Sequence, residues 1–157
     1  KPNALSFVGM EVMMLQTNLK DIQNYKHIAL YCRCGCTGPE SGQVLQAQQD
    51  ELLRWVKAIG LPAEKVSVYT DNCASFYNKQ HGLHKLLESL KDQDAPVLIA
   101  ALSCDRFCRS FWQMPALAVQ AARCGAALYS VRENIDLTKS AIKLAALHRI
   151  ALMGGVE

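Results

Sequence analysis

The stretch that decides the fold is PVLIAALSCDRFCRS, residues 96–110. Its first half is an unbroken apolar run of strand length, which is typical of a β-strand covered on both faces of a parallel sheet. Its second half is polar and carries Asp105, Arg106 and Arg109. Ligands of open α/β sheets bind beyond the carboxyl ends of the strands, so these charged residues are the first candidates for a functional site.

Short β-like runs and amphipathic helices alternate on both sides of this stretch. Further strands are predicted at 27–33, 66–71 and 126–134, helices between the strands at 45–59, 83–90 and 116–123, and a last helix at 141–153. Right-handed crossovers between such units give a mostly parallel sheet with helices on both faces. We therefore predict an α/β protein of three α/β/α layers with a mostly parallel central sheet.

Length and composition limit the possible classes of protein. The chain has 157 residues, of which 50% are hydrophobic and 20% charged, with a net charge of +3. These values suit one globular domain and exclude a disordered or collagen-like chain. We assign residues 27–157 to that domain and residues 1–26, with apolar residues at helical spacing, to an N-terminal helical extension.

The cysteines and the apolar runs indicate where the protein works. Seven cysteines at irregular spacing do not form a disulfide framework, so we interpret them as reduced thiols of a cytoplasmic protein. No apolar run reaches the roughly 18 residues of a membrane span, and no signal-peptide pattern is present, so we expect no membrane partner. Cys-x-x-Cys pairs are absent and the histidines lack ligand spacing, so no metal site is predicted.

Three arginines follow two of the predicted strands. Arg33 ends the first strand, and Arg106 and Arg109 follow the third. If the latter two begin a helix, their spacing of three residues puts both on one face, where free N–H groups add positive charge. Guanidinium groups that converge from two strand ends can bind a phosphate or stabilise charge developing on it. Solvated surface arginines are the alternative interpretation.

Four segments, in the same order, resemble the catalytic domain of the serine recombinase (resolvase/invertase) family. The family's opening strand, its second strand and acidic loop, its Asp-Arg-x-x-Arg signature and the end of its fourth strand correspond to IALYCRCGCTGPESGQVLQAQQDEL, VYTDNCAS, SCDRFCRS and SVRENIDL. Together these segments cover about residues 27–139. The resemblance implies a resolvase-like fold with a flavodoxin-like strand order, DNA as partner, and a homodimer or higher homo-oligomer.

The resemblance also implies a reaction and a set of site residues. In the family, a serine hydroxyl attacks the scissile phosphodiester and forms a 5′-phosphoserine link, and neither a metal nor a small-molecule cofactor is consumed. By position, the phosphate-clamping arginines and their acidic neighbour are Arg33, Arg106, Arg109 and Asp105. The supporting polar positions are Gln48 and Ser75, while Lys79 stands near a further family arginine.

The chain departs from the family at the nucleophile. The reacting serine belongs two residues after Arg33, and this position is Gly35, which has no side chain that could attack phosphorus. Cys36, Thr37 and Ser41 carry a thiol or hydroxyls nearby but stand out of register. We therefore expect strand cleavage to be impaired. We also expect the family's C-terminal DNA-binding domain to be absent from this chain.

Two other functions stay open at this stage. A non-catalytic pseudo-recombinase would keep the fold and serve as a structural or regulatory partner in a DNA complex. An unrelated flavodoxin-like phosphate binder would use the loop CTGPESG after the first strand, which only loosely matches a phosphate-binding loop.

Overall fold

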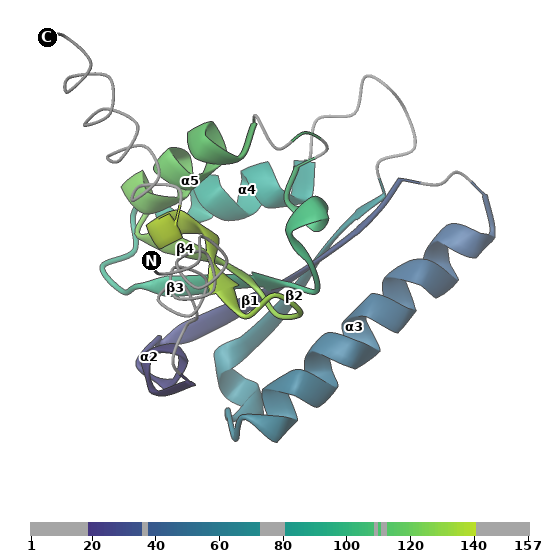
Figure 1. The fold of residues 1–157 in the computed structure, drawn as a ribbon, viewed down its shortest axis with the longest axis horizontal. Helices are drawn as coiled ribbons and strands as arrows, with labels where there is room; N and C mark the ends of the chain where they lie inside the picture. The colour runs from purple at the N-terminus through teal and green to yellow at the C-terminus, as the bar shows by residue number, and fades with distance from the viewer. Residues whose placement is uncertain (1–18, 36–37, 73–80, 109, 111–112, 141–157) are drawn as a thin grey trace, which may run out of the picture.

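A five-stranded sheet forms the centre of the computed structural model, which describes residues 19–35, 38–72, 81–108, 110 and 113–140. The strands lie in the order β2-β1-β3-β4-β5 (Figure 1). Their bounds are β1 His27–Cys34, β2 Val66–Asn72, β3 Val97–Ala101, β4 Ala126–Ser130 and β5 Ile135–Asp136. The first four strands are mutually parallel, and only β5 runs antiparallel to its neighbour β4. The predicted mostly parallel α/β fold is therefore confirmed.

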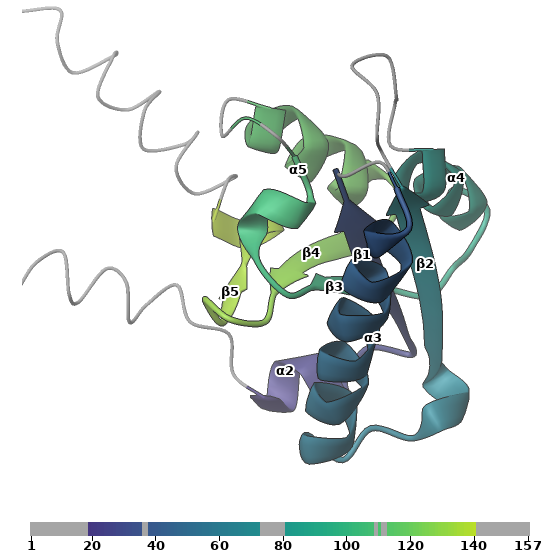
Figure 2. The same ribbon diagram turned by 90° about the vertical axis from the view of Figure 1, so that its right-hand side faces the viewer.

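Helices cover the sheet on both faces (Figures 1 and 2). Their bounds are α2 Leu19–Gln23, α3 Glu40–Ala58, α4 His81–Leu90 and α5 Met114–Arg123, with short 3₁₀ turns at Ala63–Lys65 and Cys104–Arg106. One face packs against α2 and α3, and the opposite face packs against α4 and α5. Parallel strands joined by helical crossovers require this arrangement, because both faces of the sheet are apolar.

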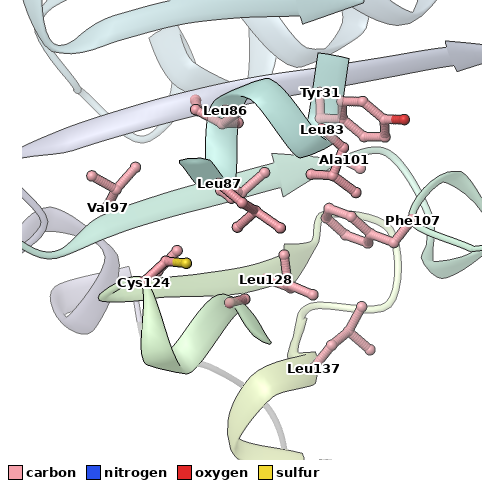
Figure 3. Close-up of a cluster of buried hydrophobic side chains, with 14 of the residues drawn as sticks. Tyr31, Leu83, Leu86, Leu87, Val97, Ala101, Phe107, Cys124, Leu128 and Leu137 are labelled. Atoms are coloured by element: carbon pink, nitrogen blue, oxygen red, sulfur yellow. The ribbon is translucent and has the colours of Figure 1, made fainter. Parts of the chain in front are cut away.

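The two core layers contain the apolar residues that alternate along the strands. All five residues of β3 are buried, with alternate side chains in different layers: Leu98 packs beneath α3, and Ile99 packs beneath α4 and α5. Figure 3 shows the second layer, where Leu83 and Leu87 of α4 approach Phe107, which follows β3. Phe107 is fully buried and stacks on Tyr31 at a ring-centroid distance of 6.0 Å. The loop after β3 is thereby held against the core.

The fourth strand is shorter than the sequence predicts. A strand was expected over 126–134, but β4 ends at Ser130 and a turn leads into the antiparallel β5. Asn134 has a φ of 52°, in the left-handed region that asparagine tolerates better than most residues. The Tyr129 hydroxyl donates a 2.5 Å hydrogen bond to Asn134 Oδ1, and this contact holds the reversal that periodicity alone does not reveal.

Part of the N-terminal segment packs on the domain. Ile22 of α2 is fully buried in the α3-side layer, and Gln23 Nε2 donates a 3.2 Å hydrogen bond to the carbonyl of Ile59. The rest of the predicted extension, and the predicted last helix at 141–153, lie outside the described residues. In the described part of the chain, no helix is long and apolar enough to cross a membrane.

The five cysteines that the structure describes fall into two groups. Cys32, Cys104, Cys108 and Cys124 are free, and burial raises the pKa of the Cys32 thiol to about 11. Cys34 is disulfide-bonded, so the interpretation of every cysteine as a reduced thiol is wrong at this position, which sequence spacing alone does not identify. Within the described residues, no group of three or more His, Cys, Asp or Glu side chains could hold a metal ion.

Candidate phosphate-binding site

The candidate site lies at the edge of the sheet where β1 and β3 end. These strands are parallel neighbours, with Leu30 opposite Ala100, so the residues that end or follow them meet at one edge. The chain then forms the 3₁₀ turn Cys104–Arg106, and α5 begins only at Met114. Arg106 therefore lies in a 3₁₀ turn that is separate from α5. The spacing of Arg106 and Arg109 suggested that both begin an α-helix, and this is wrong for Arg106.

Two arginines from distant parts of the chain are locked together through main-chain carbonyls. Arg33 Nη2 donates a 2.6 Å hydrogen bond to the carbonyl of Asp105. In return, Arg106 Nη1 donates a 3.1 Å hydrogen bond to the carbonyl of Arg33. Each guanidinium has five N–H donors, so these single bonds leave capacity for further acceptors. The structure thus brings Arg33 and Arg106 into one cluster, as predicted from their strand ends.

Asp105 supplies the negative charge of this cluster. Its Oδ2 lies 3.6 Å from Arg106 Nη2, and its Oδ1 accepts a short hydrogen bond from the Ser103 hydroxyl. The Ser103 hydroxyl and the charge of Arg106 lower the pKa of the Asp105 carboxyl. The carboxylate is thereby kept ionised beside the arginine, while its side chain remains 67% exposed. Asp105 can orient Arg106 without removing it from solvent.

Gln48 fixes the main chain of Arg33. Its side-chain amide accepts a 3.1 Å hydrogen bond from the Arg33 N–H and donates one of 2.9 Å to the Arg33 carbonyl. Gln48 lies on α3 and is only 6% exposed, so water competes little with these bonds. The Gln48 side-chain amide thus hydrogen-bonds to both the N–H and the carbonyl of Arg33, as a neighbouring β-strand would. The predicted supporting position of Gln48 gains a physical basis: it positions Arg33.

Gly35 directly follows β1 and has room for a side chain. Its chain neighbours aside, a Cβ atom added at Gly35 would meet no group of the described residues within 4 Å. Its φ is not among the positive values seen at Gly38, Gly60 and Gly125, so an L-residue fits its backbone. The structure therefore leaves space for a side chain at the position expected to carry the nucleophile, and the glycine does not supply one.

Ser41 does not replace the missing nucleophile. Its hydroxyl donates a 2.8 Å hydrogen bond to the carbonyl of Gly38 and accepts one of 3.1 Å from Asn72 Nδ2. Ser41 is only 7% exposed at the start of α3, where these bonds join the helix to the end of β2. The other two groups considered, Cys36 and Thr37, lie outside the described residues.

An anchoring pair that the sequence analysis missed lies at the end of β2. The Tyr31 hydroxyl donates a 2.8 Å hydrogen bond to Asp71 Oδ2, and both side chains are buried. The same carboxylate accepts hydrogen bonds from the first turn of α4, from the N–H of Gly82 at 2.6 Å and that of Leu83 at 3.1 Å. One sequence signal was available. Tyr31 and Arg33 are two residues apart on β1, so their side chains lie on the same face of the strand, and Tyr31 could have been expected near the site.

The remaining predicted site residues are not placed. Arg109, Ser75 and Lys79 lie outside the described residues, so their assignment to the site stays a prediction. The residues that the structure does bring together are Arg33, Gln48, Asp105 and Arg106, and Gly35 follows Arg33 by two residues. This arrangement can bind an oxyanion but holds no described nucleophile at the expected position.

Comparison with known proteins identifies the family. Residues 28–154 match the family described as "Resolvase, N terminal domain". A search of curated protein sequences gave no match. Among solved structures, the N-terminal catalytic domain of TP901-1 integrase has 22% sequence identity and a TM-score of 0.63, covering 82% of this chain and 98% of that one.

A second solved structure supports the same fold. A resolvase family site-specific recombinase from Streptococcus pneumoniae has 16% identity and a TM-score of 0.60, covering 81% of this chain and 90% of that one. At these identities the two structures establish similarity of fold. The family match extends over most of the sequence and carries the identification: this chain belongs to the resolvase family of site-specific recombinases and contains the family's N-terminal catalytic domain.

Proposed function

We propose that this domain binds a DNA backbone phosphate through Arg33 and Arg106, in a recombinase active site that lacks its nucleophile at Gly35. The observation that carries the proposal is a pair of hydrogen bonds beside an open glycine: Arg33 donates to the carbonyl of Asp105, and Arg106 donates to the carbonyl of Arg33. DNA is the partner, and assembly as a homodimer or higher homo-oligomer belongs to the same proposal.

The arginine cluster suits the charge of a phosphodiester under attack. Two guanidinium groups can each donate paired hydrogen bonds to non-bridging oxygens, where negative charge increases in the transition state. Gln48 and Asp105 hold these groups in position before the substrate binds, so little reorganisation is required. Without a nucleophile, the same guanidinium groups still bind the charged phosphate of the DNA backbone.

A serine at position 35 would supply the missing step. Its Oγ would form a bond to phosphorus as the bond from phosphorus to the 3′ oxygen breaks. The serine proton is lost and the 3′ oxygen gains a proton, leaving a 3′ hydroxyl and a 5′-phosphoserine link. The open space around Gly35 and its ordinary backbone conformation support this use of the position.

The test compares Gly35→Ser with Gly35→Ala. Each variant is incubated with a pool of nicked DNA duplexes of random central sequence, and adducts that survive SDS are counted on a gel. We expect an adduct with Gly35→Ser and none with the original sequence or Gly35→Ala, which controls for the added Cβ. Adding Arg106→Ala to Gly35→Ser should lower the adduct yield at least 100-fold, since it removes charge stabilisation at phosphorus.

The outcome also decides between this proposal and the second candidate, a non-catalytic partner in a DNA complex. The glycine at position 35 and the engaged hydroxyl of Ser41 favour that candidate for the unaltered chain. If Gly35→Ser binds the pool as Gly35→Ala does but forms no adduct, the site does not support cleavage and the partner role stands. Binding that is insensitive to both Arg33→Ala and Arg106→Ala would contradict the proposed phosphate site itself.

A further inference from the structure

Arg132 lies in the turn between β4 and β5, beside the candidate site. Its N–H donates a 2.9 Å hydrogen bond to the carbonyl of Leu102, and the N–H of Val131 donates one of 2.9 Å to the carbonyl of Ala101. These bonds continue the pairing of β4 with β3 past the end of both strands. Arg132 is thereby fixed next to the segment that leads through Ser103 to Arg106.

The Arg132 side chain reaches toward the helix that holds Arg33. Arg132 Nη2 lies 3.2 Å and 3.4 Å from the two carboxylate oxygens of Glu51 on α3. Glu51 follows Gln48 by three residues, so the two side chains are neighbours on one face of the helix. Because Gln48 clamps the main chain of Arg33, separate contacts connect Arg132 to the arginine cluster from the β3 side and the α3 side.

The ion pair with Glu51 is weak enough to exchange. The Arg132 side chain is 56% exposed and that of Glu51 is 44% exposed. Exposed ion pairs of this kind contribute little to stability, because water and salt screen them. A DNA phosphate offers the same guanidinium paired hydrogen bonds together with the release of counterions.

The backbone beneath Arg132 is held independently of that ion pair. Tyr129, whose hydroxyl bonds to Asn134 across the turn, stacks on Trp55 of α3 at a ring-centroid distance of 5.6 Å. The turn therefore presents Arg132 from a fixed position, whichever acceptor the guanidinium contacts.

We propose that Arg132 is a further DNA-contacting residue, which exchanges Glu51 for a backbone phosphate flanking the one held by Arg33 and Arg106. This inference rests on the proposed DNA binding and assigns an additional contact to it. Glu51 then acts as an internal competitor that weakens binding until DNA displaces it.

The test measures binding to a fluorescent random-sequence duplex by anisotropy over a series of salt concentrations. Arg132→Ala should weaken binding about 5–10-fold at 0.1 M salt and reduce the slope of log affinity against log salt by about 0.9, the value for one phosphate contact. Glu51→Gln should strengthen binding about 2–5-fold, since it removes the competing charge. Arg132→Lys should keep most of the slope.

The matched control is Arg123→Ala. Arg123 is an exposed arginine at the end of α5, just before β4 begins, so it lies at the opposite edge of the sheet. Its loss changes the net charge equally and should alter affinity less than 2-fold. Melting temperatures of all variants identify any loss of folded protein.

Two results separate failure of this inference from failure of the proposed function. If Arg132→Ala behaves as Arg123→Ala does, while Arg33→Ala and Arg106→Ala weaken binding, Arg132 only joins the turn to α3 and the inference is overturned. If Arg33→Ala and Arg106→Ala also leave binding unchanged, the proposed phosphate site fails first and Arg132 loses its role with it.

Discussion

The ends of β2 and β3 both carry an aspartate, but the two carboxylates do different work. Asp71, the last but one residue of β2, is 6% exposed and accepts hydrogen bonds from Tyr31 and from two N–H groups of α4. Asp105, after β3, has a side chain that is 67% exposed and contacts Ser103 and Arg106. The Asp71 carboxylate makes its hydrogen bonds within the fold, whereas the Asp105 carboxylate orients Arg106, whose guanidinium stays accessible to a ligand.

The largest effect is expected at the buried carboxylate. Asp71→Ala removes three hydrogen bonds, one from the Tyr31 hydroxyl and two from N–H groups of α4, so we expect a loss of about 3–4 kcal/mol in the free energy of unfolding. Urea denaturation followed by circular dichroism measures this loss.

Asp105→Ala is the matched control for that variant. Its exposed carboxylate should contribute less than about 1 kcal/mol to stability. Equal destabilisation by the two substitutions would remove the distinction between an anchoring and a site carboxylate.

An intermediate effect is expected at Gln48, which belongs to both the fold and the site. Gln48→Ala deprives the Arg33 N–H of its partner and should lower the free energy of unfolding by about 2 kcal/mol. It should also weaken DNA binding several-fold at temperatures where the protein stays folded, since Arg33 loses its fixed position. Denaturation and anisotropy measure the two effects separately.

Gln46→Ala provides the comparison on the same helix. Gln46 makes only an exposed hydrogen bond to Asp50, four residues on, so its removal should change stability by less than about 0.5 kcal/mol. If Gln48→Ala binds DNA like Gln46→Ala, Gln48 supports the fold alone.

The smallest effect is expected where α4 approaches Asp71. A Cβ added at Gly82 would lie 2.8 Å from Asp71 Oδ1 and 3.0 Å from the Thr70 carbonyl oxygen. Gly82→Ala should therefore lower the free energy of unfolding by about 1–2 kcal/mol. Thermal unfolding measures this cost as a lower melting temperature.

Gly42→Ala tests whether that cost comes from contact. A Cβ at Gly42, in α3, meets nothing within 4 Å, and alanine favours a helix by up to about 1 kcal/mol over glycine. The two alanine variants should therefore shift the melting temperature in opposite directions. A stabilising Gly82→Ala would show that the anchor is less tightly packed than the structure indicates.

The sequence predicts those features that depend on local periodicity and strand order. The buried run of β3 and the alternation of strands with helices were sufficient for the parallel sheet, and parallel strand ends brought Arg33 toward Arg106. The bond between Tyr31 and Asp71 escaped prediction because it depends on strand pairing across 40 residues of sequence. The turn after β4 escaped because a single left-handed residue, Asn134, ends the strand within an otherwise β-like run.

The amide clamp of Gln48 has a consequence for the variability of this domain. A helix side chain bonds to both main-chain groups of Arg33, while the Asp105 carbonyl accepts from its guanidinium, so neither contact comes from the segment that joins β1 to α3. We therefore expect side-chain exchanges in this connecting segment to leave Arg33 in place. The length of the loop between β1 and α3 could then change among related domains while the arginine at the end of β1 is retained.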